Sequence, residues 1–377
     1  MPDTTVVICV DGLDPEYFDV CEAPNIRALG RQGFFKIGRS MMPSVTNVNN
    51  VSLVTANYPA VHGISSNYRK IRETGEEVYM ESSEYILAET MFQAARRLDR
   101  RSILVTSKDK LRTLLSDGAT VAVSSEQAPS WVIEGPGVGA PPEIYSLEVN
   151  GWAIRAASFI VTRQPADIVY ITTTDFAMHT YAPDEPESQQ HITILDNAIG
   201  ELLDAHPDVT VLITADHGMS RKTKLIDLSE VLKDRGIDGE QVPIIKDRYV
   251  LHHSNLGGCM FLYLSPEHAG RLDEAVDVLR ATEGVEDVYT RDEAAEKLRL
   301  YHDRIGDIVV TGGPEVVFGP ADVSGPLGEG LPPRLRSHAS AHELAIPLIG
   351  YNGNFDGFEF NENRDLGRYV FERVLGT

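Results

Sequence analysis

Four short apolar runs, rich in β-branched residues, constrain the fold of this chain most strongly. They are TTVVICV (4–10), SILVTS (102–107), DIVYITT (167–173) and TVLITA (210–215). Near-continuous apolar runs of this length are typical of strands that helices cover on both faces. Between the last two runs, residues 188–208 carry apolar side chains at helical spacing. The pattern predicts an α/β fold with a mostly parallel central sheet flanked by helices.

The pattern changes between about residues 226 and 329. Predicted strands and helices alternate there over short segments, in the order 257–265, 266–282, 285–290, 291–300 and 305–313. This β-α-β-α-β order predicts a small inserted α+β cap domain (226–329) on a core formed by 1–225 and 330–377. A Gly- and Pro-rich segment (319–338) would lead back to the core, and the apolar run 345–352 predicts one more core strand.

Charge and composition argue against nucleic acids and anionic membranes as partners, and they predict the cellular compartment. The net charge is −22, which argues against a nucleic-acid backbone or an anionic membrane as the main partner. Three cysteines imply no disulfide framework. The start MPDTTVVICVDG has no basic leader and only a short apolar run, so we expect a cytoplasmic protein with no membrane span.

Aspartate and histidine recur where the predicted strands end. These residues are Asp11, then Asp175 and His179, then Asp216 and His217, and late in the chain His338 and His342. Taken singly, an Asp after a strand is often a turn former and a lone His a structural residue. In doubly wound sheets, however, sites form beyond the carboxyl ends of the strands, so these side chains would converge. Carboxylates and imidazoles suit zinc, with manganese or iron as alternatives.

The ligand set predicts two metal ions, because two metals about 4 Å apart can clamp the attacking and leaving oxygens of a phosphoryl transfer. A nucleophile is also needed, and segment 41–64 supplies hydroxyl groups at the start of a predicted helix. A hydroxyl there gains from the helix dipole and from free backbone N–H groups. Thr46 is one candidate for the nucleophile, and Ser44, Ser52 and Thr55 are its equals on chemistry alone. Ser44 or Thr46 could also be a plain N-cap.

Five motifs, in this order along the chain, resemble those of the alkaline phosphatase superfamily. They are VDG (10–12), PSVTNVNN (43–50), TTDFAMHTYAP (173–183), TADHGM (214–219) and SHAS (337–340). The likeness is to the branch that contains nucleotide pyrophosphatase/phosphodiesterases and phosphonoacetate hydrolases. It is closer to the latter, because of the second Asn in MPSVTNVNN and the segments TSKDKLRTLL (106–115) and RYVLHHSNLGG (248–258). The resemblance implies the alkaline-phosphatase-like fold.

The resemblance also implies roles for individual residues. One zinc would be held by Asp175, His179 and His338, and the second by Asp11, Asp216 and His217, with the nucleophile Thr46 bridging toward it. Asn49 would donate to a phosphoryl oxygen together with the Thr46–Asn47 backbone, and Lys108 and Lys110 would hold a substrate carboxylate. Two departures concern the pocket: Val48 stands where proline is usual, and SHASAHE replaces a glycine-rich stretch.

The implied reaction is cleavage of the C–P bond of phosphonoacetate to acetate and phosphate through a phosphothreonine. The leaving carbanion would be delocalised onto the adjacent carboxylate, where paired lysines stabilise the transition state more than the ground state. Water would then hydrolyse the phosphothreonine. The substrate would be a small anionic phosphonate or phosphate ester.

Several alternatives stay open at this point. The lysines of SKDKLR could be the solvated first turn of a helix capped by Ser107, although the helix dipole disfavours cations there. His252 and His253 could form a third metal site, but they fit cap or pocket lining better. A zinc phosphodiesterase, nucleotide pyrophosphatase or phosphomonoesterase would need an aromatic slot, for which Tyr58, Tyr68 and Tyr181 are candidates. A non-catalytic zinc- or ligand-binding protein is the non-enzyme alternative. The oligomeric state is open, a homodimer included.

Overall fold

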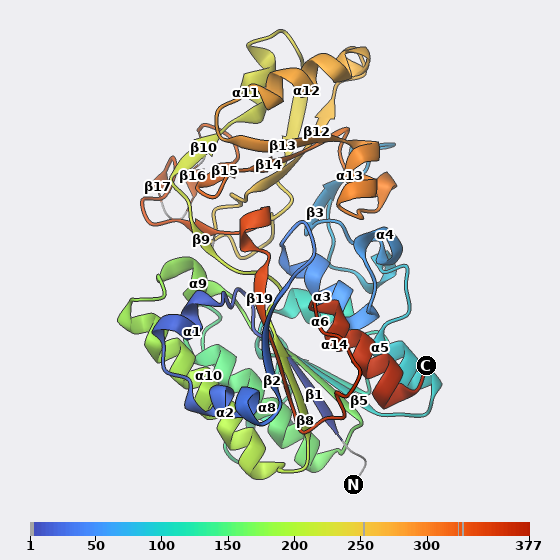
Figure 1. Cartoon of the computed structure of the whole chain (residues 1–377), viewed down its shortest axis with the longest axis vertical. Coiled ribbons are helices and arrows are strands. Elements are labelled where there is room, and N and C mark those ends of the chain that lie inside the picture. The colour runs from blue at the N-terminus through green and yellow to red at the C-terminus, as the bar shows by residue number, and fades with distance from the viewer. Residues whose placement is uncertain (1–3, 252, 323, 326–327) are drawn as a thin grey trace.

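A computed structural model describes residues 4–251, 253–322, 324–325 and 328–377. Its centre is a seven-stranded sheet with the order β2-β19-β8-β1-β7-β5-β6 (Figure 1). The bounds of these strands are β1 Thr5–Cys9, β2 Phe34–Arg39, β5 Ser102–Thr106, β6 Val121–Ser124, β7 Ile168–Thr172, β8 Thr210–Thr214 and β19 Ala345–Tyr351. All pairs are parallel except those of β19, which runs antiparallel to both β2 and β8. The predicted α/β fold with a mostly parallel sheet is therefore confirmed.

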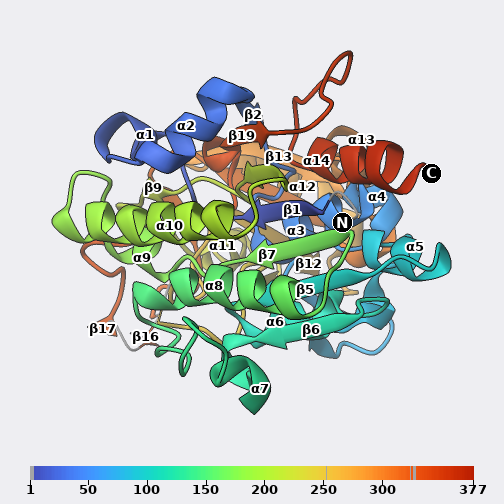
Figure 2. The same ribbon diagram turned by 90° about the horizontal axis from the view of Figure 1, so that it is seen from below.

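Two layers of helices cover this sheet, as the view from below shows (Figure 2). One layer contains α2 (Pro24–Gln32), α8 (Glu148–Arg163) and α10 (Pro186–Ala205), and the other contains α3 (Thr46–Thr55), α5 (Met91–Arg97), α6 (Asp109–Leu115) and α14 (Arg364–Tyr369). Shorter helices in the loops are α1 (Glu16–Val20), α4 (Pro59–His62), α7 (Ser130–Ile133) and α9 (Phe176–Thr180). Because both faces are covered, every residue of β1, β5 and β7 is buried, which explains their unbroken apolar runs.

A smaller sheet lies beyond the carboxyl ends of the central strands (Figure 1). Its order is β11-β12-β14-β13, with β11 Gly239–Val242, β12 Cys259–Leu264, β13 Val285–Thr290 and β14 Ile308–Gly312. The helices α11 (Leu228–Lys233), α12 (Leu272–Arg280) and α13 (Arg291–Lys297) belong to the same segment. The strand and helix order predicted for this region is present, but α12 begins later than residue 266, after a short 3₁₀ turn.

Strand β12 shows how the smaller sheet is attached to the core. Met260 and Leu262 belong to a hydrophobic cluster drawn wholly from residues 226–318, whereas Cys259, Phe261 and Tyr263 pack into the main core cluster. Successive side chains of a strand point to opposite faces, so one face of the smaller sheet closes its own core and the other packs on the large domain. The domain boundaries at 226 and 329 stay a prediction.

Four two-stranded pairings complete the architecture: β3 (Tyr68–Lys70) with β4 (Glu77–Tyr79), β9 (Ser220–Arg221) with β18 (Arg336–Ser337), β10 (Lys224–Ile226) with β15 (Val316–Phe318), and β16 (Ser324–Gly325) with β17 (Gly328–Glu329). The β9–β18 pair matters for the site, because it brings the segment before His338 next to the segment after His217. Among the described residues, no helix has the length and apolar character needed to cross a membrane.

Candidate active site

Three adjacent parallel strands deliver the acidic residues to one place. Strand β1 lies between β7 and β8, and its last residue, Cys9, is in register with Thr172 and Thr214. The chain therefore leaves all three strands at the same level of the sheet. Asp11, Asp175 and Asp216 follow within two or three residues, and each is at most 1% exposed. This convergence at the carboxyl ends is the reason that the spacing of Asp and His in the sequence carries information.

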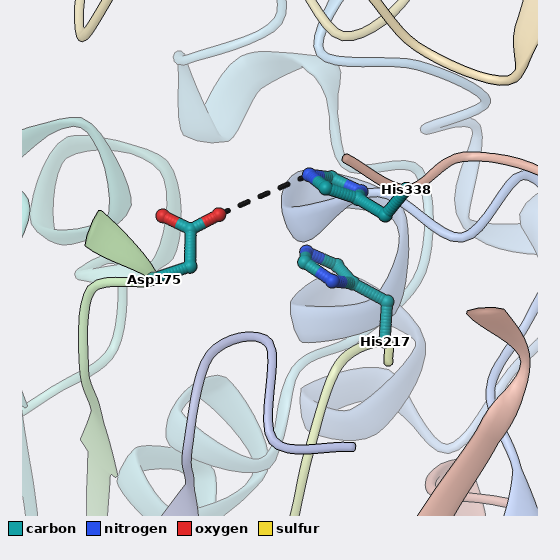
Figure 3. A group of neighbouring side chains, drawn as sticks. All are labelled: Asp175, His217 and His338. Carbon is teal, nitrogen blue, oxygen red and sulfur yellow. Dashed lines mark ion pairs between the residues drawn. The ribbon is translucent and has the colours of Figure 1, made fainter. Parts of the chain in front are cut away.

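The histidines complete a buried cluster around these carboxylates. Ligand atoms of Asp175, His217 and His338 lie within 4.8 Å of one another, as do those of Asp11, Asp216 and His217. Figure 3 shows the first group, with His338 Nε2 3.8 Å from Asp175 Oδ2. The imidazole rings of His217 and His338 stack at 3.5 Å. His217 thus belongs to both groups, whereas the resemblance assigns it to one.

His179 joins the cluster through Asp175. Its Nε2 lies 2.9 Å from Asp175 Oδ2, one helical turn away on α9. The structure therefore brings together all six of the predicted Asp and His ligands. His342, the late histidine to which the resemblance assigns no metal, lies instead against Glu286 of the smaller sheet, with its Nε2 2.6 Å from the carboxylate.

Backbone carbonyls orient the three imidazoles of the cluster. The Nδ1 atoms of His179, His217 and His338 lie 2.6, 2.9 and 2.6 Å from the carbonyl oxygens of Arg336, Gly218 and Ser44. A carbonyl only accepts, so each Nδ1 carries a proton, which leaves Nε2 as the ring nitrogen available to a metal. An outer hydrogen bond of this kind is what fixes the tautomer of metal-binding histidines.

The unsatisfied polar atoms of the cluster fit a cation. Among the described residues, Asp11 Oδ1, Asp216 Oδ2 and His217 Nε2 are buried without a hydrogen-bond partner. Burial and the nearby Asp11 carboxylate raise the pKa of Asp216 well above its usual value. Burial alone would lower the pKa of His217, but Asp216 and Asp11 outweigh it and raise this pKa to about 9. Clustered buried anions of this kind require positive charge, and the donor set suits zinc.

Lys108 and Lys110 are buried, so neither is a solvated first turn. Lys108 Nζ lies 2.9 Å from Asp11 Oδ2 and 2.6 Å from Asp175 Oδ1, inside the cluster. Lys110 Nζ lies 2.5 Å from Asp247 Oδ2. Both ammonium groups lie about 6 Å from the ring centre of Tyr249, at 5.9 and 5.8 Å. Lys108 therefore lies inside the anionic cluster, and Lys110 lies against the same tyrosine ring as Lys108.

Thr46 is the first residue of α3, and the structure separates it from its rivals. Ser44 Oγ donates to Ser340 O, and Thr55 Oγ1 donates to Val51 O. Ser52 Oγ lies 2.8 Å from His62 Nε2, but His62 Nδ1 accepts the Ile64 N–H. His62 therefore donates to Ser52 and cannot act as its base. Within the described part of the chain, only the Thr46 hydroxyl of these four has no hydrogen-bond partner.

The structure corrects the prediction for Asn49. Its Oδ1 accepts from Met41 N and from Asn363 Nδ2, and its Nδ2 donates to Met41 O and Val45 O. Both ends of the amide are used to hold the turn before α3, so Asn49 cannot also donate to a phosphoryl oxygen. The Asn47 N–H donates to Asn67 Oδ1 at 3.0 Å. Asn67, at the end of the HGISSN segment, is therefore the amide side chain at the start of α3 that the sequence interpretation missed.

Asn150 of α8 is a second residue that sequence interpretation missed. Its Oδ1 accepts from Ser107 Oγ and from Thr174 N, and its Nδ2 donates to Thr174 O. The same Nδ2 lies 3.0 Å from His191 Nε2. One buried amide therefore holds the residue before Lys108 and the residue before Asp175. Ser107 is not the cap of α6, because its hydroxyl is donated to this amide.

One cavity of the structure is lined by Lys110 and by several aromatic side chains. It has a volume of about 730 Å³, and its lining includes Lys110 and four tyrosines, Tyr79, Tyr85, Tyr145 and Tyr249. The candidates Tyr58, Tyr68 and Tyr181 do not line it. His253 does not line this cavity; its Nε2 lies 3.4 Å from Asp247 Oδ1 and its ring 5.4 Å from that of His179. His252 lies outside the described residues.

Comparison with known proteins identifies the family. The sequence model of type I phosphodiesterase / nucleotide pyrophosphatase matches residues 5–325. Phosphonoacetate hydrolase from Sinorhizobium meliloti 1021, solved in complex with phosphonoformate, is 31% identical with a TM-score of 0.88 over 99% of this chain and 96% of that one. Its complex with phosphonoacetate gives 31% and 0.87 with the same coverage. Murine ectonucleotide pyrophosphatase / phosphodiesterase 5 shares the fold at 16% identity and a TM-score of 0.71, over 99% and 95% of the chains.

The family match spans most of the chain, and it agrees with the order of motifs in the sequence and with the central sheet of the structure. The chain belongs to the type I phosphodiesterase / nucleotide pyrophosphatase family, within the alkaline phosphatase superfamily.

Proposed function

We propose that this protein hydrolyses the C–P bond of phosphonoacetate, giving acetate and phosphate, with two zinc ions and a phosphothreonine intermediate on Thr46. The observation that carries the proposal is the pair of buried lysines beside the Asp/His cluster. A phosphate monoester with a neutral tail has no need of two cations there, whereas phosphonoacetate has a carboxylate one carbon away from phosphorus. The 31% identity to a phosphonoacetate hydrolase over nearly the whole chain supports the same assignment.

The six Asp and His residues of the cluster form two sets of three, one for each proposed metal ion. Asp175, His179 and His338 would hold one zinc, and Asp11, Asp216 and His217 the other, with manganese or iron as alternative metals. When bound, the metals act as Lewis acids that polarise the phosphoryl group and favour the ionised form of a nearby hydroxyl.

The residues of this chain supply the nucleophile and the charge stabilisation. The Thr46 hydroxyl releases its proton, and its oxygen forms a bond to phosphorus while the P–C bond breaks and that electron pair passes to the departing carbon. That charge spreads onto the carboxylate as an enolate-like group, where Lys108 and Lys110 stabilise it before the carbon takes up a proton. The α3 N-terminus favours the negative phosphoryl group through its dipole. Water then cleaves the Thr46 phosphoester and releases phosphate.

Phosphate release from a panel of substrates tests the proposal directly. We expect the zinc-loaded protein to release phosphate from phosphonoacetate faster than from p-nitrophenyl phosphate or from a p-nitrophenyl phosphodiester. Faster turnover of either ester would move the assignment to a phosphomonoesterase or a phosphodiesterase. Absence of turnover on all three, with zinc bound, would favour a non-catalytic binding protein.

The phosphodiesterase alternative rests on the cavity with four tyrosines. A volume of about 730 Å³ exceeds what a two-carbon tail needs, and tyrosine rings can stack on a nucleoside or aryl group. The family match to type I phosphodiesterase / nucleotide pyrophosphatase agrees with this possibility. The same substrate panel separates the two functions.

Replacing Lys110 with alanine tests the role of the substrate carboxylate. A charge-assisted contact is worth about 1.5–3 kcal/mol, so kcat/KM for phosphonoacetate should fall about ten- to a hundredfold. Hydrolysis of p-nitrophenyl phosphate should stay near its starting rate, because Lys110 contacts Asp247 and not the cluster carboxylates. Lys108→Ala should damage both reactions, since Lys108 also pairs with Asp11 and Asp175.

Lys246→Ala is the matched control for this experiment. Lys246 lies on the loop that carries Asp247, but its ammonium packs on the ring of Tyr68 at 4.1 Å. The variant has the same change in charge as Lys110→Ala. Equal losses of kcat/KM for phosphonoacetate in the two variants would mean that the overall electrostatic field of the protein matters and that a direct contact of Lys110 with the substrate carboxylate does not.

A further inference from the structure

The loop between β11 and β12 (residues 243–258) joins the smaller sheet to the active site. Near its start, Asn67 N donates to Ile244 O at 2.9 Å. At its end, Gly258 N donates to His338 O at 2.8 Å, and Ser337 Oγ donates to Leu256 O at 2.6 Å. The loop is thus held at one end beside α3 and at the other beside a proposed metal ligand.

Asp247 is the residue of this loop whose carboxylate contacts Lys110. Its Oδ2 lies 2.5 Å from Lys110 Nζ, and its Oδ1 accepts from Tyr249 N at 2.8 Å. His253 Nε2 lies 3.4 Å from the same Oδ1. Burial alone would raise the pKa of Asp247, but Lys110 and His253 hold it well below its usual value. The Asp247 carboxylate is therefore held by Lys110 on one side and by two groups of its own loop, Tyr249 N and His253, on the other.

The two lysines have different counter-ions. Lys108 is paired with Asp11 and Asp175, which belong to the core cluster. Lys110 is paired with Asp247, which belongs to the loop from the smaller sheet. A buried ammonium without a counter-ion either loses its proton or moves toward another anion. The position of the Lys110 ammonium therefore depends on Asp247.

We propose that Asp247 is a positioning residue that determines specificity, holding Lys110 so that the site selects substrates with a carboxylate tail. The inference rests on the proposed function, because it gives Lys110 the carboxylate as its ligand. It adds that recognition of the tail is shared between the core and the segment that carries the smaller sheet. Lys108 recognises the tail from inside the cluster, and the Asp247–Lys110 pair recognises it from the loop side.

Binding of two phosphonates measures this role without turnover. In the zinc-loaded Thr46→Ala background, titration calorimetry compares phosphonoacetate with ethylphosphonate, which lacks the carboxylate. Asp247→Asn keeps the acceptor for Tyr249 N but removes the charge opposite Lys110. We expect it to weaken phosphonoacetate binding about tenfold and to change ethylphosphonate binding by less than about twofold.

Lys110→Met and the double variant test whether Asp247 acts through Lys110. In the Lys110→Met background, Asp247→Asn should cause no further loss of phosphonoacetate affinity. Replacing both members of a buried pair by neutral groups also costs less stability than removing one, so the double variant should fold at least as well as either single variant. Asp109→Asn is the matched control, because Asp109 lines the same cavity as Lys110 but pairs with Arg112.

Several results would overturn the proposal. Equal loss of affinity for both phosphonates, or a loss that persists in the Lys110→Met background, would make Asp247 a residue that only supports the fold. Tighter phosphonoacetate binding in Asp247→Asn would make it a competitor of the substrate carboxylate. Failure of the proposed function gives a different result, namely no phosphate release by the unmodified protein, whatever the binding selectivity of the variants.

Discussion

Thr46→Ala is expected to reduce phosphate release by at least about a thousandfold while two metal ions remain bound. Only the proposed nucleophile is lost, since the Thr46 side chain has no hydrogen-bond partner among the described residues. The α3 helix should persist, because its first residue is capped by no side chain and its fold contacts are made by neighbours such as Asn49. Turnover and metal content, the latter by elemental analysis, check the two halves of this expectation.

Thr55→Val is the matched control on the same helix. It also removes one buried hydroxyl, but the Thr55 hydroxyl donates to Val51 O and does not face the cluster. Its turnover should remain near that of the unmodified protein. Substantial residual turnover in Thr46→Ala would contradict the assignment and return Ser44 to consideration.

Asp216→Asn is expected to have opposite effects on metal binding and on stability without metal. The amide can still accept from Gly12 N and His217 N through Oδ1, so the local fold is kept. At Oδ2, which has no hydrogen-bond partner in the described residues, it places an NH₂ group that cannot bind a cation. Bound metal should fall from about two to about one per chain, and turnover should fall at least about a hundredfold.

The metal-free variant should unfold at a higher temperature than the metal-free unmodified protein. Burial and the nearby Asp11 carboxylate disfavour the ionised form of Asp216, and an amide, which does not ionise, avoids both costs. Zinc at a hundredfold excess over its Kd should stabilise the unmodified protein by roughly 3 kcal/mol per site and the variant by less. Thermal unfolding with chelator and with zinc measures both signs.

Asp196→Asn provides the comparison for this second prediction. Asp196 is equally buried, but its carboxylate accepts from the backbone N–H groups of Asn25 and Ile26, far from the cluster. It should lose stability and keep both metals. A metal-free Asp216→Asn protein that is less stable than the unmodified one would show that the carboxylate cluster does not strain the fold.

The sequence was most informative where geometry follows from neighbouring strands. A parallel sheet aligns the ends of its strands, so Asp11, Asp175 and Asp216 could be placed together from three short motifs. The antiparallel direction of β19 could not be predicted, because the pattern of an apolar run does not show in which direction the strand runs relative to its neighbours. Burial of Lys108 and Lys110 was also hidden, since lysines at the start of a short helix are usually solvated.

The residues that were missed act through partners far away in the chain. Asp247 meets Lys110 across 137 positions, and Asn150 meets Ser107 across 43. Neither residue belongs to a sequence motif of known chemical function, so only the tertiary structure shows its role. Asn49 was misplaced for the opposite reason. It stands in a motif, but the motif does not show whether an amide faces the substrate or holds its own turn.

The order of strands in the central sheet has a consequence for synthesis on the ribosome. Strand β2 pairs only with β19 in this sheet. Arg39 is in register with Ala345, so about 300 further residues must be synthesised before β2 can pair. Strands β1, β5, β6, β7 and β8 can assemble earlier, but β2 then stays a loose hydrophobic segment in which Phe35 and Ile37 remain partly exposed even in the finished fold. Open strand edges of this kind invite pairing with other chains. Residues 34–39 of a nascent chain therefore need protection until β19 has left the ribosome. A chain truncated before β19 should aggregate and should not form a smaller enzyme.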